Sequence, residues 1–398
     1  MKQKLDDFMI CVPTKIFFGK TALDHLAEGI QQYGNRVMIV YGGGSIKKMG
    51  LYEKVIQILD ENDIFHCELS GVQPNPRVSL IKEGIEQARR NKVDIILPVG
   101  GGSVIDTGKG IAAGYFYEGD FWDLAGANIT HNRVLPILTI LTLPAAGSEM
   151  ATGCTWVNDA FTPPEKNSFH GPYIRPRISY LNPEFTYSLS PKQTAAGVCD
   201  IMSHILESYF SNEKGAYLHA RTAEGMLKTL VKYTPIAMSD PTNYEARANI
   251  MYCSSWGNNG YIVKGNYVSW SVHLLENPLN EHFNITHGEG LAILTPHWMR
   301  WAKRPENLYR YVDLGVNVFG IDHSLDENVI ANQAIEAVED FYYHVLRMPK
   351  RLRDIGVTPD VFEECAKELT TPFITEYLAD AFVPISYEDA VSLYQQAY

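Results

Sequence analysis

Two polar residues four positions apart are the most chemically suggestive feature of this chain. Asp200 and His204 fall within residues 190–210, where Ser190 and Gln193 predict a capping box and apolar residues recur at helical spacing. Residues four apart project from the same side of a helix. A carboxylate beside an apolar stripe needs a partner or a metal ion, because an isolated buried charge is very costly. For this pair alone, an ordinary Asp–His hydrogen bond is the simpler interpretation.

Two histidines further along the chain favour the metal interpretation. His273 and His287 stand 14 residues apart, in Val-Ser-Trp-Ser-Val-His and Asn-Ile-Thr-His-Gly-Glu-Gly. One carboxylate and three imidazoles suit iron, zinc, manganese or nickel as divalent ions. Because the set contains no thiolate, we expect a Lewis-acid site with room for a substrate rather than a structural zinc site.

A glycine-rich turn suggests a second kind of site. Residues 98–109 read Pro-Val-Gly-Gly-Gly-Ser-Val-Ile-Asp-Thr-Gly-Lys, which predicts the end of a strand, a turn and the start of a helix. Amides at a helix N-terminus and the helix dipole attract anions, and glycines let a diphosphate approach the backbone. The pattern is not Gly-x-Gly-x-x-Gly, so the ordinary Rossmann fingerprint is absent. Ser103 and Asp106 also have a structural interpretation, as a capping box.

Strands and helices alternate in the first half of the chain. Apolar runs, two of them closed by glycines, predict buried parallel strands, and the segments between them have helical spacing. This alternation predicts a doubly wound parallel sheet. The predicted strands are residues 36–41, 64–69, 93–99 and 135–142, and the predicted helices are 22–33, 52–62, 78–91 and 103–117.

Beyond Ser190 the apolar spacing is helical, and no segment alternates like a strand. We therefore predict two domains, an α/β domain at 1–187 and an all-helical domain at 188–398; the family resemblance described below implies that the first is dinucleotide-binding and the second metal-binding and catalytic. The helices predicted after residues 190–210 are 216–233, 244–258, 291–302, 306–319, 327–347 and 359–369.

The composition is that of an ordinary globular enzyme, with 45% hydrophobic and 20% charged residues in 398. A net charge of -12 without any basic run argues against nucleic acid and anionic membranes as partners. The apolar runs are too short to span a membrane, and acids occupy the place of a signal peptide's apolar region. The six scattered cysteines, without Cys-x-x-Cys, indicate reduced thiols in a cytoplasmic protein.

The motifs together carry a family resemblance over nearly the whole chain. Gly-Gly-Gly-Ser-x-x-Asp-x-x-Lys at 100–109, with the four candidate ligands downstream, resembles the iron-dependent (group III) alcohol dehydrogenases. Four further segments resemble the branch of NAD(P)H-dependent butanol dehydrogenases and aldehyde reductases. They are Tyr-Gly-Gly-Gly-Ser-Ile-Lys-Lys at 41–48, Gly-Val-Gln-Pro-Asn-Pro at 71–76, Thr-Leu-Pro-Ala-Ala-Gly-Ser-Glu at 142–149 and Leu-Ala-Ile-Leu-Thr-Pro-His-Trp-Met-Arg-Trp at 291–301.

This resemblance implies a dehydroquinate synthase-like fold, with a nucleotide-binding α/β domain followed by an all-α domain. It implies that one divalent metal ion, Fe²⁺ ahead of Zn²⁺, Mn²⁺ or Ni²⁺, is bound by Asp200, His204, His273 and His287. It also implies a set of cofactor-binding residues. Gly101, Gly102 and Ser103 would hold the diphosphate, and Asp106 belongs to the same cofactor-binding segment. Asn75, Thr142 and Lys166 would line the cofactor cleft. Gly43, Gly44 and Ser45 would lie around the adenosine ribose.

The chain departs from the family at the residues expected to handle the proton. A family histidine four residues after the first metal histidine is replaced by Asn277, which Pro278 follows. His282 is a candidate substitute, so Asn277 and His282 are the candidate catalytic residues. Ala146 and Ala151 replace the threonine and asparagine common near the nicotinamide.

The expected function is that of an alcohol dehydrogenase of class EC 1.1.1.-. It would transfer a hydride between NADP(H) and a small primary alcohol or aldehyde, as butanol dehydrogenases or aldehyde reductases do, and by analogy it would form a homodimer. One alternative is a metal-dependent lyase on the same scaffold. Residues 196–210 and 269–290 contain neither Lys nor Arg, which favours a small neutral substrate over a polyanionic one. The other alternative is a catalytically weak nucleotide- and metal-binding protein.

We expect NADP(H) to be preferred over NAD(H). NAD sites usually offer a carboxylate to the ribose 2′-hydroxyl after a strand, and residues 41–48 contain no acid. Glycine amides and Ser45 can donate to a 2′-phosphate, and Lys47 or Lys48 can supply charge. The alternative is that the glycines only form a tight turn and the lysines are solvated.

Overall fold

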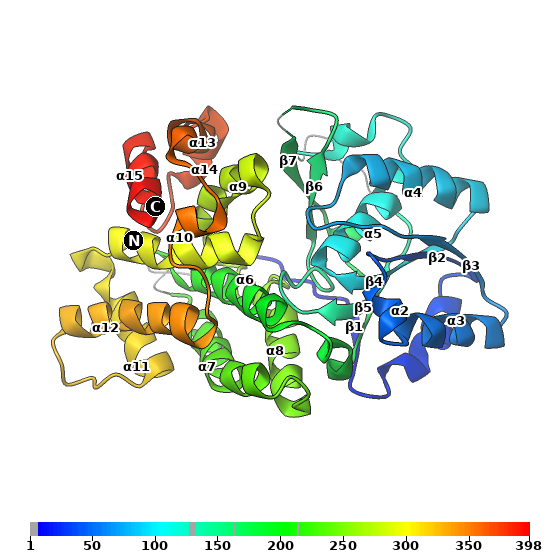
Figure 1. The fold of residues 1–398 in the computed structure, drawn as a ribbon, viewed down its shortest axis with the longest axis horizontal. Coiled ribbons are helices and arrows are strands. Elements are labelled where there is room, and N and C mark those ends of the chain that lie inside the picture. The colour runs from blue at the N-terminus through cyan, green and yellow to red at the C-terminus, as the bar shows by residue number, and fades with distance from the viewer. Residues whose placement is uncertain (1–6, 127–132, 163, 213–214) are drawn as a thin grey trace. The chain divides into compact units, whose positions relative to one another are not determined.

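The computed structural model describes residues 7–126, 133–162, 164–212 and 215–398 (Figure 1). The chain divides into two compact units. One contains Cys11–Leu189 with Ser254–Asn259, and the other contains Ser190–Cys253 and Gly260–Tyr398 with the N-terminal residues up to Ile10. They are called the α/β unit and the helical unit below.

The α/β unit contains a six-stranded sheet in its described residues, with the order β1-β8-β5-β4-β2-β3. Every pairing in it is parallel, which confirms the predicted doubly wound sheet. The strands are β1 (Lys15–Phe18), β2 (Arg36–Val40), β3 (Phe65–Leu69), β4 (Ile95–Gly101), β5 (Leu138–Leu143) and β8 (Ile178–Leu181). The helices are α1 (Leu26–Gln31), α2 (Ser45–Lys48), α3 (Leu51–Glu61), α4 (Val78–Asn91) and α5 (Gly102–Gly114).

The direction in which strands are added to the sheet changes at β2. The chain goes from β2 outward to β3 and then returns to the other side of β2 to form β4. Val40 is therefore paired with Leu69 on one side and with Pro98 on the other. The carboxyl ends of β2 and β4, each followed by a glycine turn, lie side by side at this switch point, where open α/β sheets bind their ligands.

A two-stranded antiparallel hairpin, β6 (Gly153–Asn158) and β7 (Glu165–His170), was not predicted. Its second strand reads Glu-Lys-Asn-Ser-Phe-His, which lacks the apolar alternation of a half-buried strand. The hairpin is tied to α5 through Asp106, whose carboxylate accepts hydrogen bonds from the Thr155 amide and the Ser148 hydroxyl.

These contacts make the predicted Ser103–Asp106 capping box wrong. The N-cap of α5 is Gly101 rather than Ser103, and glycine has no side chain with which to cap the helix. Asp106 lies more than one turn into α5 and uses its carboxylate on the hairpin instead. The buried Lys109 of α5 likewise donates to the carbonyls of Ala151 and Gly153, at 3.1 and 2.7 Å. The carboxylate of Asp106 therefore binds the distant hairpin instead of capping its own helix.

The helical unit confirms the predicted change of architecture, because no strand follows β8 in the described part of the chain. The predicted helices are present, and α9, α14 and α15 are additional. The helices are α6 (Pro191–Tyr209), α7 (Tyr217–Ser239), α8 (Tyr244–Gly257), α9 (Ser271–Phe283), α10 (His287–Ala302), α11 (Leu308–Phe319), α12 (Glu327–Asp340), α13 (Phe362–Leu369), α14 (Pro372–Leu378) and α15 (Tyr387–Ala397). Helix α8 ends in residues that belong to the α/β unit.

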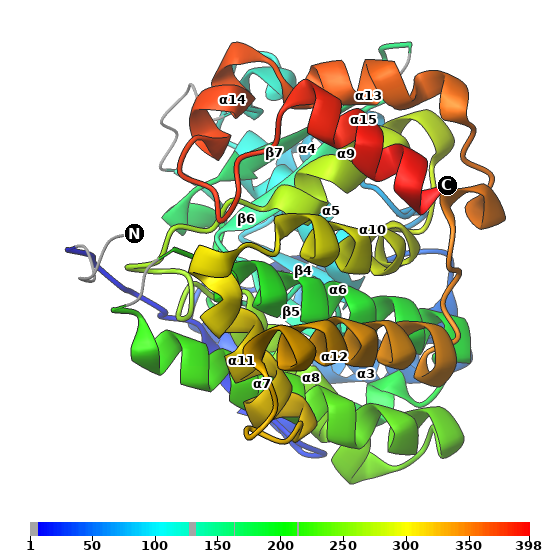
Figure 2. The ribbon, with the colours of Figure 1, turned by 90° about the vertical axis from the view of Figure 1, so that its left-hand side faces the viewer.

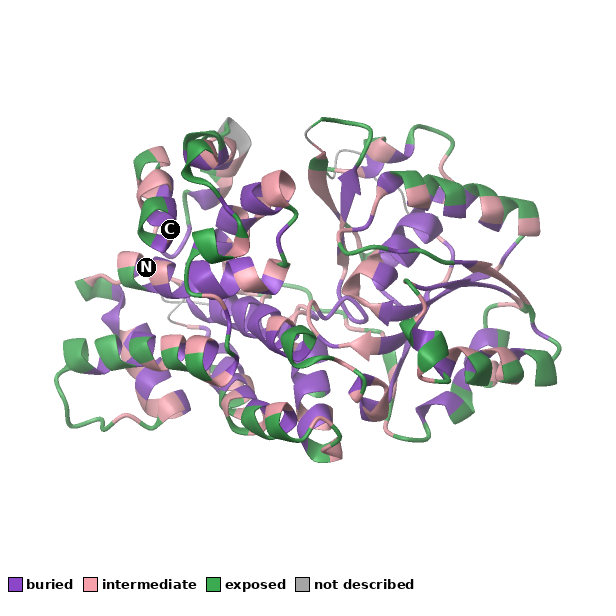
Figure 3. Cartoon of the chain, viewed as in Figure 1, coloured by how far each residue is buried: buried purple, intermediate pink, exposed green. Residues whose placement is uncertain are grey.

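Helix α6 is the central helix of this unit. Its predicted capping box is confirmed: the Gln193 amide donates to Ser190 Oγ at 3.2 Å, and the Ser190 amide donates to Gln193 Oε1 at 3.0 Å. From Thr194 onward most of its residues are buried, as the purple ribbon of Figure 3 shows. It packs against α7 and α10, and α10 runs beside it in Figure 2. Polar residues on α6 are therefore held inside a packed core.

Helix α10 begins four residues earlier than predicted. The prediction rested on the apolar spacing, which begins at Leu291, whereas Gly288 and Gly290 are weak helix formers. In the structure a Cβ on Gly288 would lie 2.2 Å from the carbonyl oxygen of Ala196 in α6. The glycine therefore permits α6 and α10 to approach closely where His287 begins its helix.

None of the helices in the described residues is both long enough and apolar enough to cross a membrane.

Replacing Gly288 by alanine tests this close approach. The added methyl group would collide with backbone, which cannot rotate away as a side chain can, so we expect destabilisation by about 1–3 kcal/mol. The matched control is Gly225→Ala on α7, where a Cβ would meet nothing within 4 Å among the described residues. That control should stabilise the protein by roughly 0.5–1 kcal/mol through helix propensity. Denaturant unfolding measures both, and equal effects of the two substitutions would refute the packing argument.

Candidate functional site

Asp200, His204 and His273 form a group that could hold a metal ion. One potential ligand atom from each lies within 4.8 Å of the others. Asp200 Oδ1 is 3.1 Å from Nδ1 of His204, its neighbour one turn along α6, and 3.8 Å from Nε2 of His273 on α9. The structure thus brings together residues more than sixty positions apart in sequence.

His287, the fourth predicted ligand, lies beside this group. It is the first residue of α10, and its Nε2 is 3.8 Å from Asp200 Oδ1. Its ring centroid is 5.2 Å from that of His273. All three histidines therefore surround the same carboxylate oxygen, although His287 lies outside the tightest group of three.

The donor atoms fit a divalent cation. Asp200 Oδ1 and His273 Nε2 are both buried and make no hydrogen bond within the described structure. Burial alone would raise the pKa of Asp200, but the neighbouring imidazoles, His204 first, hold that pKa well below its usual value. An ionised carboxylate and an imidazole nitrogen, both buried and unpaired, are a ligand set suited to a borderline metal ion.

Two buried glutamates that the sequence analysis missed hold the outer nitrogens of the histidines. Nδ1 of His273 hydrogen-bonds to Glu207 Oε1, and Glu207 Oε2 accepts the Val272 amide at 2.8 Å. Nδ1 of His287 lies 2.6 Å from Glu276 Oε2. A carboxylate on the second nitrogen fixes a metal-binding histidine's tautomer and orientation, and it leaves Nε2 available for the ion.

A sequence signal for these glutamates existed. Glu207 follows His204 by three residues and Glu276 follows His273 by three, so each acid lies on the same helix face as a candidate ligand. Each also interrupts an apolar run, which is unusual for a charged residue. The spacing could not show, however, that Glu207 on α6 contacts the histidine of α9.

The charge balance of this region calls for a cation. The side chains of Asp200, Glu207 and Glu276 are 8%, 3% and 0% exposed. The segments 196–210 and 269–290 supply no Lys or Arg. Burial would lower the pKa of His273, but Glu207 and Asp200 raise it to about 10. The carboxylates therefore stabilise positive charge where the candidate ligands meet.

Trp270, which the sequence analysis did not single out, borders the same group. Its φ of 50° is in the left-handed region, which is rare for a bulky residue and marks strain that the surrounding structure must hold. Its ring lies edge-on to His204 at 5.6 Å and to His273 at 5.4 Å between centroids. The indole thus shields two of the imidazoles from water.

The two candidate catalytic residues of α9 have different surroundings. Asn277 lies one turn after His273 and so on the same side of the helix, directly before Pro278. His282 is nine residues from His273, which corresponds to two and a half turns and the opposite side. Its Nε2 is 3.5 Å from Glu368 of α13. The structure therefore does not bring His282 to the metal group and gives no support to it as the substitute proton relay.

In the α/β unit, the glycine turn after β4 leads directly into α5. Gly101 ends the strand and Gly102 begins the helix. The amides of the first turn and the dipole of this 13-residue helix are therefore suited to bind an anion. Thr142 lies in β5 next to the end of β4, where Gly101 is paired with Leu143. The predicted diphosphate residues are thus at the carboxyl edge of the sheet.

The other predicted cofactor residues lie at the same edge or on the hairpin. Gly43, Gly44 and Ser45 follow β2, adjacent to β4 at the switch point. Asn75, with a φ of 58°, lies in the loop after β3. That loop meets the hairpin, because the Val157 amide donates to the Pro76 carbonyl at 2.8 Å and Val157 is paired with Lys166. Asn75 and Lys166 therefore belong to neighbouring segments.

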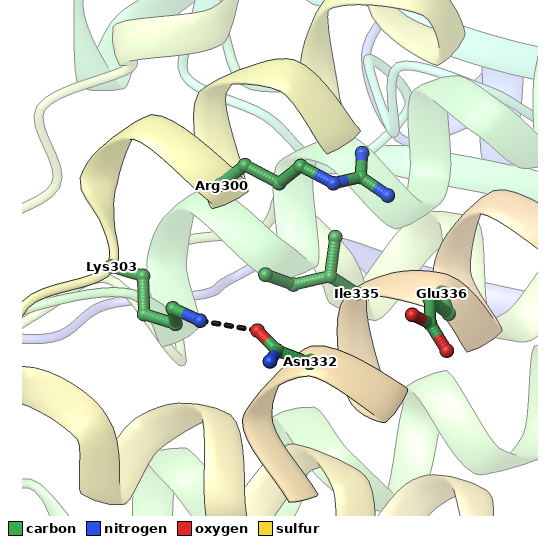
Figure 4. A pocket seen from close by; sticks show the side chains of 5 residues that line it. All are labelled: Arg300, Lys303, Asn332, Ile335 and Glu336. Atoms are coloured by element: carbon green, nitrogen blue, oxygen red, sulfur yellow. Dashed lines mark hydrogen bonds between the residues drawn. The ribbon is translucent and has the colours of Figure 1, made fainter. Parts of the chain in front are cut away.

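A pocket of about 310 Å³ lies elsewhere in the helical unit (Figure 4). Arg300 and Lys303 at the end of α10 line it with residues of α12. Arg300 is 13 residues after His287, about 20 Å along the helix. The two basic side chains that line the pocket already have partners, since Arg300 is paired with Glu339 and Lys303 donates to Asn332. The pocket is therefore separate from the candidate metal group.

Comparison with known protein families gives a match over most of the chain. A family model described as iron-containing alcohol dehydrogenase matches residues 13–183. A model of the C-terminal part of the Fe-containing alcohol dehydrogenase family matches residues 194–398.

Individual proteins are similar over nearly their whole length. NADH-dependent butanol dehydrogenase B of Clostridium acetobutylicum is 47% identical, with 91% of this chain and 92% of that protein covered. NADPH-dependent aldehyde reductase YqhD of Escherichia coli is 34% identical, with 94% and 95% covered. The crystal structure of NADH-dependent butanol dehydrogenase A from Thermotoga maritima superposes with a TM-score of 0.92 at 32% identity, covering 99% of both chains.

Glu207→Gln tests the role of the outer glutamates. The amide can still accept the Val272 hydrogen bond but no longer balances charge on His273, so metal affinity should fall about 10–100-fold. Glu224→Gln is the control, because Glu224 is about as buried in the same unit but interacts with Tyr209, Asn317 and Arg221 instead. Titration of metal-free protein with Fe²⁺ or Zn²⁺ measures the affinity. If both variants bind metal as wild type does, the glutamates do not support the site.

Proposed function

The chain belongs to the iron-containing alcohol dehydrogenase family, and from this premise we propose that it catalyses hydride transfer between NADP(H) and a small primary alcohol or aldehyde. The reaction falls in class EC 1.1.1.-, of the butanol dehydrogenase or aldehyde reductase type. The observation that carries the proposal is the buried group of Asp200, His204 and His273 with His287 beside it. The comparisons support an alcohol or aldehyde oxidoreductase and give no support to the lyase alternative.

We propose that Asp200, His204, His273 and His287 bind one divalent ion, Fe²⁺ ahead of Zn²⁺, Mn²⁺ or Ni²⁺. When bound, the ion would supply Lewis-acid polarisation of the substrate oxygen. The protein's own part is to hold the donors in place: Glu207 and Glu276 keep two imidazoles oriented, and Trp270 limits the access of water to them.

For the cofactor, the turn around Gly101 with the first turn of α5 would hold the diphosphate, and the turn around Gly43 would lie at the adenosine ribose. When bound, the nicotinamide would supply the hydride chemistry. Residues 41–48 contain no acid and carry Lys47 and Lys48, which supports NADP(H) over NAD(H). The names of the relatives described above include both NADH and NADPH, so they do not decide the preference.

The proton step would not use a histidine at position 277. The amide of Asn277 does not titrate near neutrality as an imidazole does, so water or a hydroxyl group would deliver the proton to the product oxygen. A catalytically weak nucleotide- and metal-binding protein remains the competing function. It would bind both ligands without turning over any of a panel of small aldehydes.

We also propose a homodimer in the cytoplasm. Phe8, Met9 and Ile10 are exposed, and the ring of Phe8 lies 6.3 Å from that of His219. Tyr217, two residues before His219 in the sequence, is also exposed. Exposed large apolar side chains at neighbouring positions are one feature of protein interfaces, which supports this proposal. All six cysteines are unpaired, as is usual in a reducing compartment.

Loss of a ligand tests the metal assignment. Asp200→Ala and His287→Ala should each lose bound metal and turnover together, by well over the roughly 10–100-fold loss typical of an outer-shell change. Metal analysis of anaerobically purified protein and assays with butanal measure the two effects. His282→Ala is the control and should retain metal, because His282 pairs with Glu368 on the far side of α9. Full activity in a metal-free Asp200→Ala protein would refute the assignment.

Gly43→Asp tests the cofactor preference. A side chain fits there, because a Cβ on Gly43 would meet nothing within 4 Å among the described residues. The new carboxylate should penalise NADPH by like-charge repulsion, by on the order of 1–3 kcal/mol in kcat/KM, and should leave NADH unaffected or improved. A wild-type kcat/KM that is higher with NADH than with NADPH would overturn the proposed preference.

A further inference from the structure

A cluster of two tyrosines, a lysine and a glutamate stands beside the glycine turn of β2. Tyr41 Oη donates to Glu68 Oε2 at 2.7 Å, and Tyr52 Oη donates to Glu68 Oε1. Lys47 Nζ lies over both rings, 5.0 Å from the centroid of Tyr41 and 4.3 Å from that of Tyr52. The lysine and the carboxylate thus share the same two tyrosines, one through ring faces and the other through hydroxyls.

This cluster belongs to the edge of the sheet where the cofactor ribose is proposed to bind. Tyr41 directly follows β2, and Glu68 lies in β3, which is paired with β2. The Gly71 amide donates to the Gly42 carbonyl at 3.2 Å, so the ends of the two strands are held together. The sequence analysis found no acid at residues 41–48, but the neighbouring strand supplies one.

The charge of Glu68 is therefore the quantity that matters for a nucleotide at this edge. A carboxylate favours a ribose 2′-hydroxyl and repels a 2′-phosphate. Here both oxygens of Glu68 accept tyrosine hydroxyls, and the hydrogen bond from Tyr52 to Glu68, with burial, raises the pKa of Tyr52 to about 12. The Tyr41 hydroxyl, ahead of Glu68, raises the pKa of Lys47, so the charged form of the lysine is favoured over the two tyrosine rings.

We propose that Lys47 neutralises Glu68 through this shared tyrosine pair, and that the neutral cluster is what lets the β2 turn accept a 2′-phosphate. This inference rests on the proposed function, because it assigns a part to one side of the proposed cofactor site. It differs from a direct contact, in which Lys47 would bind the phosphate itself and Glu68 would not matter. Its consequence is that removing Lys47 harms NADPH binding only while Glu68 carries its charge.

The test compares Lys47→Met with the double variant Lys47→Met/Glu68→Gln. Fluorescence titration of the full-length protein gives the Kd of NADPH and of NADH for each. In Lys47→Met the affinity ratio should shift toward NADH by on the order of five- to tenfold, and the shift should shrink in high salt. In the double variant the ratio should return to within about twofold of wild type. Lys54→Met, an exposed lysine of α3, is the control for net charge and should leave the ratio unchanged.

Three outcomes would overturn the inference. An unchanged ratio in Lys47→Met would show that Glu68 is not felt at the cofactor. A double variant that keeps the whole loss would show that Lys47 contacts the phosphate directly. Wild-type protein that binds neither nucleotide would overturn the proposed function and this inference with it, whereas the first two results overturn the inference alone. Thermal unfolding of every variant identifies any change of ratio that is due to misfolding.

Discussion

Three carboxylates buried in a helical core are the constraint on which the candidate metal centre depends. Asp200, Glu207 and Glu276 would each be very costly to bury alone. The neighbouring imidazoles supply part of the positive charge that these carboxylates need. The raised pKa of His273 shows that the carboxylates around it favour positive charge. Because removing one partner of a buried charged group costs far more than the pair contributes, the helices that carry these residues have little freedom to move apart. The core position of α6 and the close approach of α10 at Gly288 are consistent with this requirement.

The part of the site that could be predicted is the part encoded by local spacing and donor chemistry. Asp200 and His204 are four apart on one helix, so a single turn brings them together. Contacts between helices left no such pattern: Glu207 meets a histidine more than sixty residues away, and the left-handed backbone of Trp270 is imposed by its surroundings. Residue type alone does not place a side chain either, because His282 lies two and a half turns from His273 and is paired with Glu368.

The prediction of the fold was right where the structure follows local sequence patterns and wrong where tertiary contacts decide it. Buried parallel strands such as β2 and β4 are continuous apolar runs, so the sequence pattern shows them directly. The hairpin strand β7 is polar and is stabilised by its partner and by the loop that contains Pro76. Asp106 fits a capping box in sequence, yet it serves the hairpin instead, because a tertiary hydrogen bond replaced the local one. Where tertiary contacts replaced local ones, the sequence pattern misled.

The metal group and the glycine turn after β2 share one further property. In each, the role of an acidic side chain depends on the groups that surround it. In the helical unit, Asp200 is surrounded by imidazoles and lacks a lysine or arginine on its own segment, which makes it a candidate metal ligand. In the α/β unit, Glu68 lies in the strand beside the proposed ribose site, and its carboxylate accepts hydrogen bonds from two tyrosines whose rings lie under Lys47. The same side-chain chemistry therefore supports opposite functions, and the sequence alone cannot distinguish them, since the partners arrive from other strands and helices. If the proposed cofactor site is correct, cofactor choice would depend on the cluster around Glu68 and on the open turn at Gly43 together.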